Sequence, residues 1–165
     1  MNIPRFVSAI TLITLTSCAV NSTPGDGAGL AIRPAKAAMI GDAVDITDKY
    51  RDIALQVTLT KVIDPAPPSR PTTGKRFIAA RFRMKNNGAK EYKEAPGARL
   101  IDKSGEAYDS TFNVGCKELG SRKIRLTSGE MQIGCITFEV DKDAKPERIR
   151  FGAPSGFSTA VWRIK

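Results

Sequence analysis

The residue types that most often carry out enzymatic chemistry are scarce in this chain. Its 165 residues include no histidine and only three cysteines. Without histidine the chain cannot build a Ser-His-Asp or Cys-His nucleophilic site, or a zinc or iron site with imidazole ligands. No Ser-x-x-Lys pair and no glycine-rich phosphate loop takes their place. We therefore expect a protein that is not an enzyme and that needs no metal or other cofactor.

Carboxylates offer two weaker candidates for chemistry. Four aspartates near the expected start of the folded domain could form a general acid and base pair; they are Asp42, Asp45, Asp48 and Asp52. The run from Asp102 to Glu106 resembles a calcium loop, but Lys103 interrupts it and calcium needs six or more oxygens. We interpret the first group as solvated charges at strand ends and the second as a hairpin turn.

The first cysteine closes an N-terminal leader. Arg5 precedes the apolar run Phe6–Leu15, whose ten residues are too few to span a bilayer core of about 30 Å. The leader therefore predicts a secretion signal over residues 1–17. It ends in Leu15-Thr16-Ser17-Cys18, which resembles a bacterial lipobox. That resemblance implies a diacylated Cys18 that anchors the chain stably in the membrane, and an ordinary secretion signal is the alternative.

The other two cysteines, Cys116 and Cys135, form an even pair in a chain expected to be exported, so we predict a disulfide. They are not spaced as Cys-x-x-Cys, and no further ligand supports a metal. Cys135 has the parity of Thr137 and faces outward from the core, unless a bulge at Gly134 shifts the register. The bridge should then join the loop 113–130 to the surface or edge of the sheet, and not cross the core.

Basic residues dominate the charge of the chain. It has 26 Lys and Arg against 17 Asp and Glu, a net charge of +9, which favours anionic neighbours. Two groups stand out. The first is a strand row of Arg81, Arg83 and Lys85, with Arg76, Lys90 and Lys93 nearby, and the second is Lys117, Arg122, Lys123 and Arg125. They indicate either an anionic partner or a solvated face that resists aggregation. Few aromatic residues interleave the cations, so no nucleic acid is expected as a partner.

Alternation of apolar and polar residues predicts the elements that carry these side chains. It is clearest over 53–60, 78–85 and 136–140, and shorter candidate strands lie at 44–46, 98–101, 107–112, 148–151 and 161–164. Turn residues separate the runs, and no helical stripe is visible. We predict an all-β domain over residues 40–165, a single immunoglobulin-like antiparallel β-sandwich of about seven to eight strands. Phe151, Phe157 and Trp162 should pack in it, and residues 18–39 read as a flexible tether.

A family resemblance follows from the order of these segments. The chain has Gly41-Asp42-Ala43-Val44 and then the long run from Gly74 to Asn86. It continues with Arg99–Tyr108, Leu126–Gly129, Gly134–Val140 and Trp162-Arg163-Ile164. This order resembles the extracellular immunoglobulin-like domain of unknown function found in Gram-positive lipoproteins, of the actinobacterial type. That domain is similar in fold to a secreted mycobacterial immunoprotective antigen. The resemblance implies a fold and an extracytoplasmic location, without an activity.

Three functional hypotheses remain. The first is a non-enzymatic binding or interaction module of the cell envelope, anchored to the membrane by lipid on its extracytoplasmic face. Its partners would be an anionic envelope polymer, lipid headgroups or another envelope protein. The second is a structural accessory subunit of a membrane or cell-wall complex, and the last is a hydrolase that uses only carboxylates. The sequence defines neither the ligand nor the oligomeric state.

Overall fold

The computed structural model describes residues 37–48, 50–67, 70–111, 116–119, 123–152 and 158–164. The leader, Cys18, most of the tether, Arg122 and Phe157 lie outside these ranges. The described part contains no helix that is long and apolar enough to cross a membrane. Its nine strands are β1 (Ala38–Met39), β2 (Ala43–Asp48), β3 (Ile53–Ile63), β4 (Lys75–Asn86), β5 (Gly97–Asp102), β6 (Ala107–Thr111), β7 (Met131–Asp141), β8 (Pro146–Gly152) and β9 (Ala160–Arg163).

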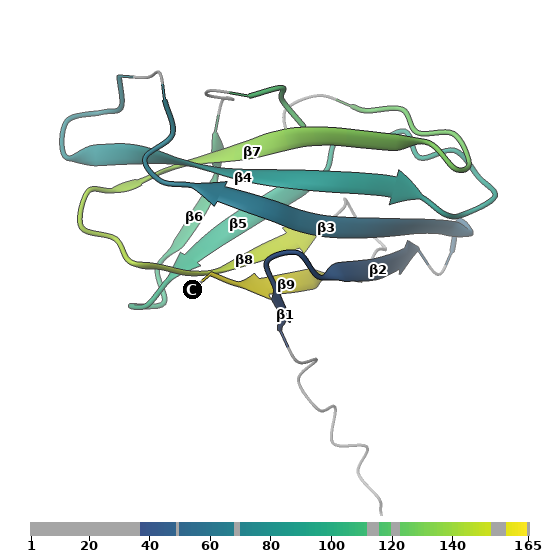
Figure 1. The fold of residues 1–165 in the computed structure, drawn as a ribbon, viewed down its shortest axis with the longest axis horizontal. Helices are drawn as coiled ribbons and strands as arrows, with labels where there is room; N and C mark the ends of the chain where they lie inside the picture. Colours follow the sequence, from purple (N-terminus) through teal and green to yellow (C-terminus); the bar gives the residue numbers. More distant parts are fainter. Residues whose placement is uncertain are drawn as a thin grey trace, which may run out of the picture. The chain divides into compact units, whose positions relative to one another are not determined.

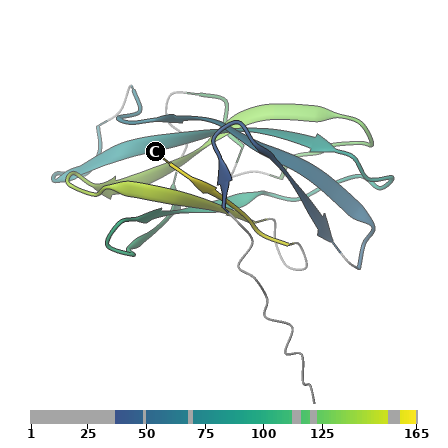
Figure 2. The same ribbon diagram turned by 60° about the horizontal axis from the view of Figure 1, so that its bottom comes forward.

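The strands form two layers that one strand joins (Figures 1 and 2). β2, β3, β4 and β7 make one layer in that order, and β5, β8, β9 and β1 make the other. β6 pairs with β5 through Ala107–Asp109 and with β7 through Ser110 and Thr111, so it passes from one layer to the other. The predicted all-β sandwich is confirmed.

The strand count exceeds the prediction by one. The additional strand is β1, whose two residues are too few to show an alternating pattern. β1 pairs with β9 in parallel, whereas every other pair of described strands is antiparallel. It starts two residues before position 40, inside the unit Ala35–Lys165.

The core lies between the layers and follows the predicted parity. On β4 the side chains of Ile78, Ala80, Phe82 and Met84 are all buried, and β3 and β7 bury the matching residues of their own inward faces. The opposite layer adds apolar side chains from β5, β8 and β9, among them Leu100, Ile149, Phe151 and Trp162. Together these surfaces make the main hydrophobic core.

Three aromatic rings connect the layers at the centre of this core. The ring centroid of Phe82 on β4 lies 5.0 Å from that of Phe151 on β8 and 5.9 Å from that of Trp162 on β9. The indole N–H of Trp162 donates to the carbonyl oxygen of Asp42 at 3.0 Å, which satisfies its only donor. Phe151 and Trp162 are therefore core residues, as predicted.

Candidate functional site

The row of cations on β4 is placed as the alternation predicts. Because successive side chains of a strand point to opposite faces, burying Phe82 and Met84 directs Arg81, Arg83 and Lys85 outward. All three are exposed. β4 pairs with β3 on one side and with β7 on the other, so the row stands on a central strand of its layer.

The neighbours of this row come from β3 and β7. Lys61 of β3 is the register partner of Arg81, just after a bulge in β3, and it adds a fourth exposed cation that the sequence analysis did not include. On the other side, Ile133 pairs with Arg83 and Met131 pairs with Lys85. These two apolar side chains are exposed by 38% and 55%. The open part of this sheet face therefore combines cations with exposed apolar groups.

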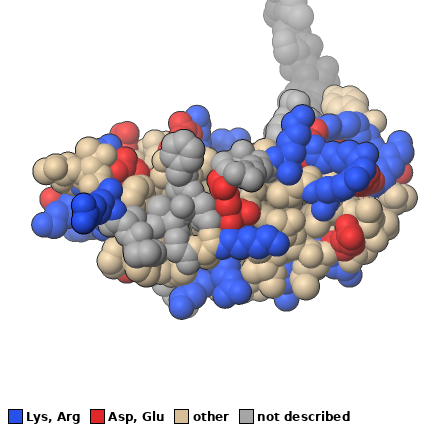
Figure 3. Space-filling model, turned by 90° about the horizontal axis from the view of Figure 1, so that it is seen from above, with Lys and Arg blue, Asp and Glu red and all other residues tan. Residues whose placement is uncertain are grey.

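No carboxylate in the described part of the chain lies within ion-pair distance of Arg81, Arg83 or Lys85. Figure 3 shows that Lys and Arg gather most densely at its right end, with some Asp and Glu among them. We call Lys61, Arg81, Arg83 and Lys85 the β4 cation row. Its charges face solvent without a local counter-ion among the described residues.

The second predicted group of cations is described only in part. Lys117 is exposed beside β7, where its carbonyl oxygen accepts from the N–H of Cys135 at 2.7 Å. Lys123 is exposed as well, and Arg125 forms an ion pair with Glu91. Lys93 contacts the same carboxylate at 2.7 Å, and these two cations hold the pKa of Glu91 below its usual value, Lys93 more strongly. Arg125 and Lys93 are thus compensated, while Arg122 lies outside the described residues.

Arg76 is close in sequence to the β4 row, but its guanidinium forms hydrogen bonds with other parts of the domain. Its guanidinium donates to both carboxylate oxygens of Asp64, at 2.7 and 3.0 Å. It also donates to the carbonyl oxygens of Asp141, at 2.8 Å, and Ala144, at 2.8 Å, and to that of Lys142. Arg76 therefore ties the loop after β3 to the turn after β7.

Cys116 and Cys135 form a disulfide, with their Cα atoms 5.9 Å apart. The pairing of β4 with β7 is continuous, so no bulge occurs at Gly134 and Cys135 points away from the main core as expected. It is nevertheless fully buried, because it packs with Ala66 and Ala79 in a second, smaller cluster. The N–H of Leu119 also donates to the carbonyl oxygen of Cys135 at 2.9 Å. The bridge thus lies outside the main core and fixes the 116–119 segment along β7.

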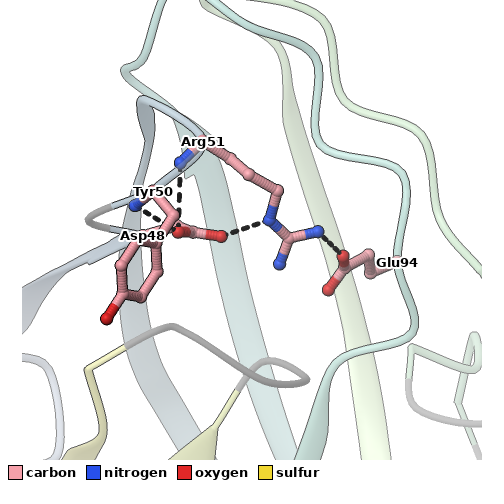
Figure 4. Close-up of polar contacts among 4 residues, drawn as sticks. All are labelled: Asp48, Tyr50, Arg51 and Glu94. Carbon is pink, nitrogen blue, oxygen red and sulfur yellow. Dashed lines mark hydrogen bonds and ion pairs between the residues drawn. The ribbon is translucent and has the colours of Figure 1, made fainter.

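Three of the aspartates near the domain start accept hydrogen bonds from different local partners. Asp42 accepts from the N–H of Met39 at 2.8 Å, and Asp45 from the amide of Gln56 at 3.2 Å. Asp48 is buried and accepts from the N–H groups of Tyr50, at 2.8 Å, and Arg51, at 3.2 Å (Figure 4). These carboxylates hold local structure at separate places.

The guanidinium of Arg51 links Asp48 to Glu94 (Figure 4). Burial alone would raise the pKa of Asp48, but the hydrogen bonds from Tyr50 and Arg51 outweigh it and lower that pKa. The network joins the turn after β2 to the segment before β5, and the charge of Asp48 is already satisfied. It is a structural ion pair.

The run from Asp102 to Glu106 is the hairpin turn between β5 and β6. One oxygen of Asp102 accepts from the N–H and the hydroxyl of Ser104, at 2.8 and 2.6 Å, and from the N–H of Glu106 at 3.0 Å. The hydroxyl contributes most to lowering the pKa of Asp102. The described residues contain no group of three or more His, Cys, Asp or Glu able to hold a metal.

A third set of cations was missed by the sequence analysis. Arg99 of β5, Arg148 and Arg150 of β8, and Arg163 of β9 are all exposed on the outer face of the other layer. Arg148 and Arg150 alternate with the buried Ile149 and Phe151, so the same period-two signal that identified the β4 row could have identified them.

Comparison with known proteins places the chain in a family. A family model described as "Domain of unknown function (DUF4352)" matches residues 44–161. The chain belongs to this DUF4352 family. A search of curated protein sequences found no match.

Solved structures share the fold of this DUF4352 protein. The secreted protein MPT63 of Mycobacterium tuberculosis is 12% identical with a TM-score of 0.54, covering 78% of this chain and 96% of MPT63. The yjhA protein of Bacillus subtilis is 12% identical with a TM-score of 0.55, covering 78% and 99%. An uncharacterised β-sandwich protein of Clostridium difficile is 15% identical with a TM-score of 0.50, covering 79% and 95%.

Proposed function

We propose that this DUF4352 protein is a non-enzymatic binding module of the cell envelope, which holds an anionic envelope component on the β4 cation row. A lipid on Cys18 would keep it at the extracytoplasmic face of the membrane. The lipobox-like Leu15-Thr16-Ser17-Cys18 supports the anchor. The secreted protein MPT63 shares the fold, and this similarity supports a location outside the cytoplasm.

The observation that carries the binding proposal is the position of Arg81, Arg83 and Lys85 on a central strand. Charged residues on edge strands prevent strands of different molecules from pairing. β4 is hydrogen-bonded to β3 on one side and to β7 on the other, so its cations are not needed to prevent pairing with another molecule. Protection of a free edge therefore does not explain this row, and an anionic partner is the explanation that we propose.

The row is also preorganised for a repetitive anion. Side chains on one face of a strand repeat about every 7 Å, and the two neighbouring strands hold the β4 backbone rigid. A ligand with regularly spaced negative groups would therefore meet several cations without a large ordering cost in the protein. Anionic headgroups and anionic wall polymers both have this character.

A charge-neutralising variant tests the proposal. We would compare the full chain with Arg81→Gln/Arg83→Gln/Lys85→Gln, measuring salt-dependent retention on phosphatidylglycerol vesicles and on anionic wall polymer. The matched control is Lys103→Gln/Lys142→Gln/Lys145→Gln, which removes the same charge from exposed turns. The row variant should be released at lower salt than the wild type. Equal release of the two variants would refute the row as a binding surface.

The accessory-subunit hypothesis is favoured by one specific observation, the exposure of Met131 and Ile133 beside the same cations. Exposed apolar groups next to charges are a usual composition for a protein interface. Under this alternative, one envelope protein would co-purify in fixed stoichiometry and withstand high salt. The variant Met131→Ser/Ile133→Ser should then abolish co-purification while leaving salt-dependent retention on anionic vesicles unchanged.

A further inference from the structure

Four arginines lie in two cross-strand pairs on the outer face of the β5, β8 and β9 layer. Arg99 of β5 is the register partner of Arg150 of β8. One step of the pleat further along, Arg148 of β8 is the register partner of Arg163 of β9. This arginine face belongs to the layer opposite the β4 cation row, so an inference from it does not depend on that row.

The described residues compensate these arginines incompletely. Arg99 is paired with Asp109 of β6 at 2.5 Å, but both side chains are more than half exposed, so the pair contributes little. Arg148 lies 3.8 Å from the carboxylate of Glu147. Arg150 and Arg163 have no carboxylate of the described chain within ion-pair distance. Like charges directly opposite on neighbouring strands are destabilising, and a bound anion would relieve this repulsion.

A groove begins beside the first of these pairs. It has a volume of about 470 Å³, and Arg99 and Arg150 line it. Gly97 and Gly152 line the same groove. They are register partners, two residues from Arg99 and Arg150 on the same two strands. A Cβ atom built on Gly97 would meet only the carbonyl oxygen of Gly152, at 3.6 Å. Two adjacent strands therefore both lack a side chain in this part of the groove.

The polar groups of the groove indicate the chemistry of its ligand. The two arginines can donate to an acidic group, for which the planar guanidinium is well shaped. Asp109 supplies an acceptor, and the hydroxyls of Ser110 and Thr159 both donate and accept. A ligand that only accepts hydrogen bonds, such as inorganic polyphosphate, would leave Asp109 facing like charge. A sugar that carries an acid group satisfies both kinds of partner.

We propose that this groove binds an acid-bearing glycan, with its acid group on Arg99 and Arg150 and its hydroxyls on Asp109, Ser110 and Thr159. An acidic peptide fits less well. Peptides commonly bind a sheet by adding a strand to a free edge, and both β5 and β8 are paired on both sides. Arg148 and Arg163 extend the cationic surface beyond the groove. They could bind a further acid group of the same glycan.

Binding of oligogalacturonate to the full chain, measured by isothermal titration calorimetry, tests the proposal. Neutral dextran, inorganic polyphosphate and polyglutamate serve as the comparison ligands. The variant Arg99→Gln/Arg150→Gln should weaken oligogalacturonate binding by about tenfold or more, since charge-assisted hydrogen bonds are lost. The control Lys103→Gln/Lys142→Gln removes the same charge outside the groove, and its affinity should stay within about twofold of the wild type.

A second variant separates a shaped site from general charge attraction. Gly97→Leu fills the groove and leaves the net charge unchanged, so it should also weaken oligogalacturonate binding by about tenfold. Thermal unfolding of Gly97→Leu and the milder Gly97→Ala would confirm that the fold is intact. Wild-type affinity in Gly97→Leu would overturn the proposal. So would polyphosphate or polyglutamate binding with the same affinity and the same dependence on these variants.

Discussion

Gly134 of β7 leaves the space in which Leu119 lies. A Cβ atom on Gly134 would stand 3.0 Å from the Cβ atom of Leu119 and 2.8 Å from the carbonyl oxygen of Lys117. Both distances are too short for an ordinary contact, and the second involves backbone. This glycine therefore allows the segment 116–119 to lie along β7 and to bury Leu119 in the main core.

The variant Gly134→Ala should displace that segment. We expect a loss of about 1–3 kcal/mol in the free energy of unfolding, the usual cost of overpacking a buried site. Urea unfolding followed by tryptophan fluorescence would measure it, because Trp162 is in the core. Gly152→Ala is the matched control, since its Cβ atom would meet only a Thr159 methyl carbon at 3.7 Å. Equal stability of Gly134→Ala and the wild type would contradict this role.

The disulfide should stabilise the fold mainly by restricting the unfolded chain. Cys116 and Cys135 are 19 residues apart, and closing a loop of this length contributes about 3 kcal/mol. Reduced wild type and the variant Cys116→Ala/Cys135→Ala should therefore unfold at similar, lower urea concentrations than the oxidised protein. A reduced protein as stable as the oxidised one would show that other contacts alone hold the 116–119 segment.

Acid should remove the stabilisation that Asp48 supplies. Its pKa is lower in the folded protein than its usual 3.8, so its contribution is complete above that pH and is lost as the pH falls through the folded value. Asp48→Asn should lower the melting temperature at pH 7, and the difference from the wild type should shrink below about pH 4. Melting curves from pH 7 to about pH 2 measure this.

Asp45→Asn is the control for that series, because Asp45 is exposed and its carboxylate accepts a hydrogen bond from Gln56 in place of an ion pair. Its melting temperature should follow the wild type at every pH. A constant difference between Asp48→Asn and the wild type across the whole range would mean that the charge of Asp48 is not what stabilises the turn after β2.

Arg76 should not tolerate replacement by lysine. Its guanidinium donates to Asp64 and to three carbonyl oxygens at once. An ammonium group has fewer donors and cannot arrange them in one plane. We expect Arg76→Lys to cost about 2 kcal/mol, within the range for hydrogen bonds to charged groups. Chemical denaturation measures the loss. Lys75→Arg, at an exposed neighbouring position, is a control that should leave stability within about 0.5 kcal/mol.

Several features of the fold and site were predictable because they depend on neighbours in the chain. The period-two pattern of β4 decides which side chains enter the core, so the outward direction of Arg81, Arg83 and Lys85 follows from it. The same parity predicts that Cys135 turns away from the main core. The hairpin at Asp102 follows from the local preference of Asp, Ser and Gly for turns.

Other features depend on which strands become neighbours. Arg99 and Arg150 are 51 positions apart in the sequence, and only the β5–β8 register makes them partners. The same applies to the contact of Arg51 with Glu94 and to the second cluster that buries Cys135. No local pattern encodes such pairings, because alternation defines the face of a side chain but not the strand beside it.

The sequence by itself determined the all-β fold, the direction of each strand's side chains and the pairing of the two cysteines of the domain. It also determined the excess of positive charge. Only the tertiary structure decided where that charge is concentrated. It neutralised Arg76 and Arg125 in ion pairs and left the β4 cation row open. It also brought four arginines together in two cross-strand pairs, one of which lines a groove that contains two glycines. The physical reason is that charges interact through space, and their distances are set by strand register and layer packing.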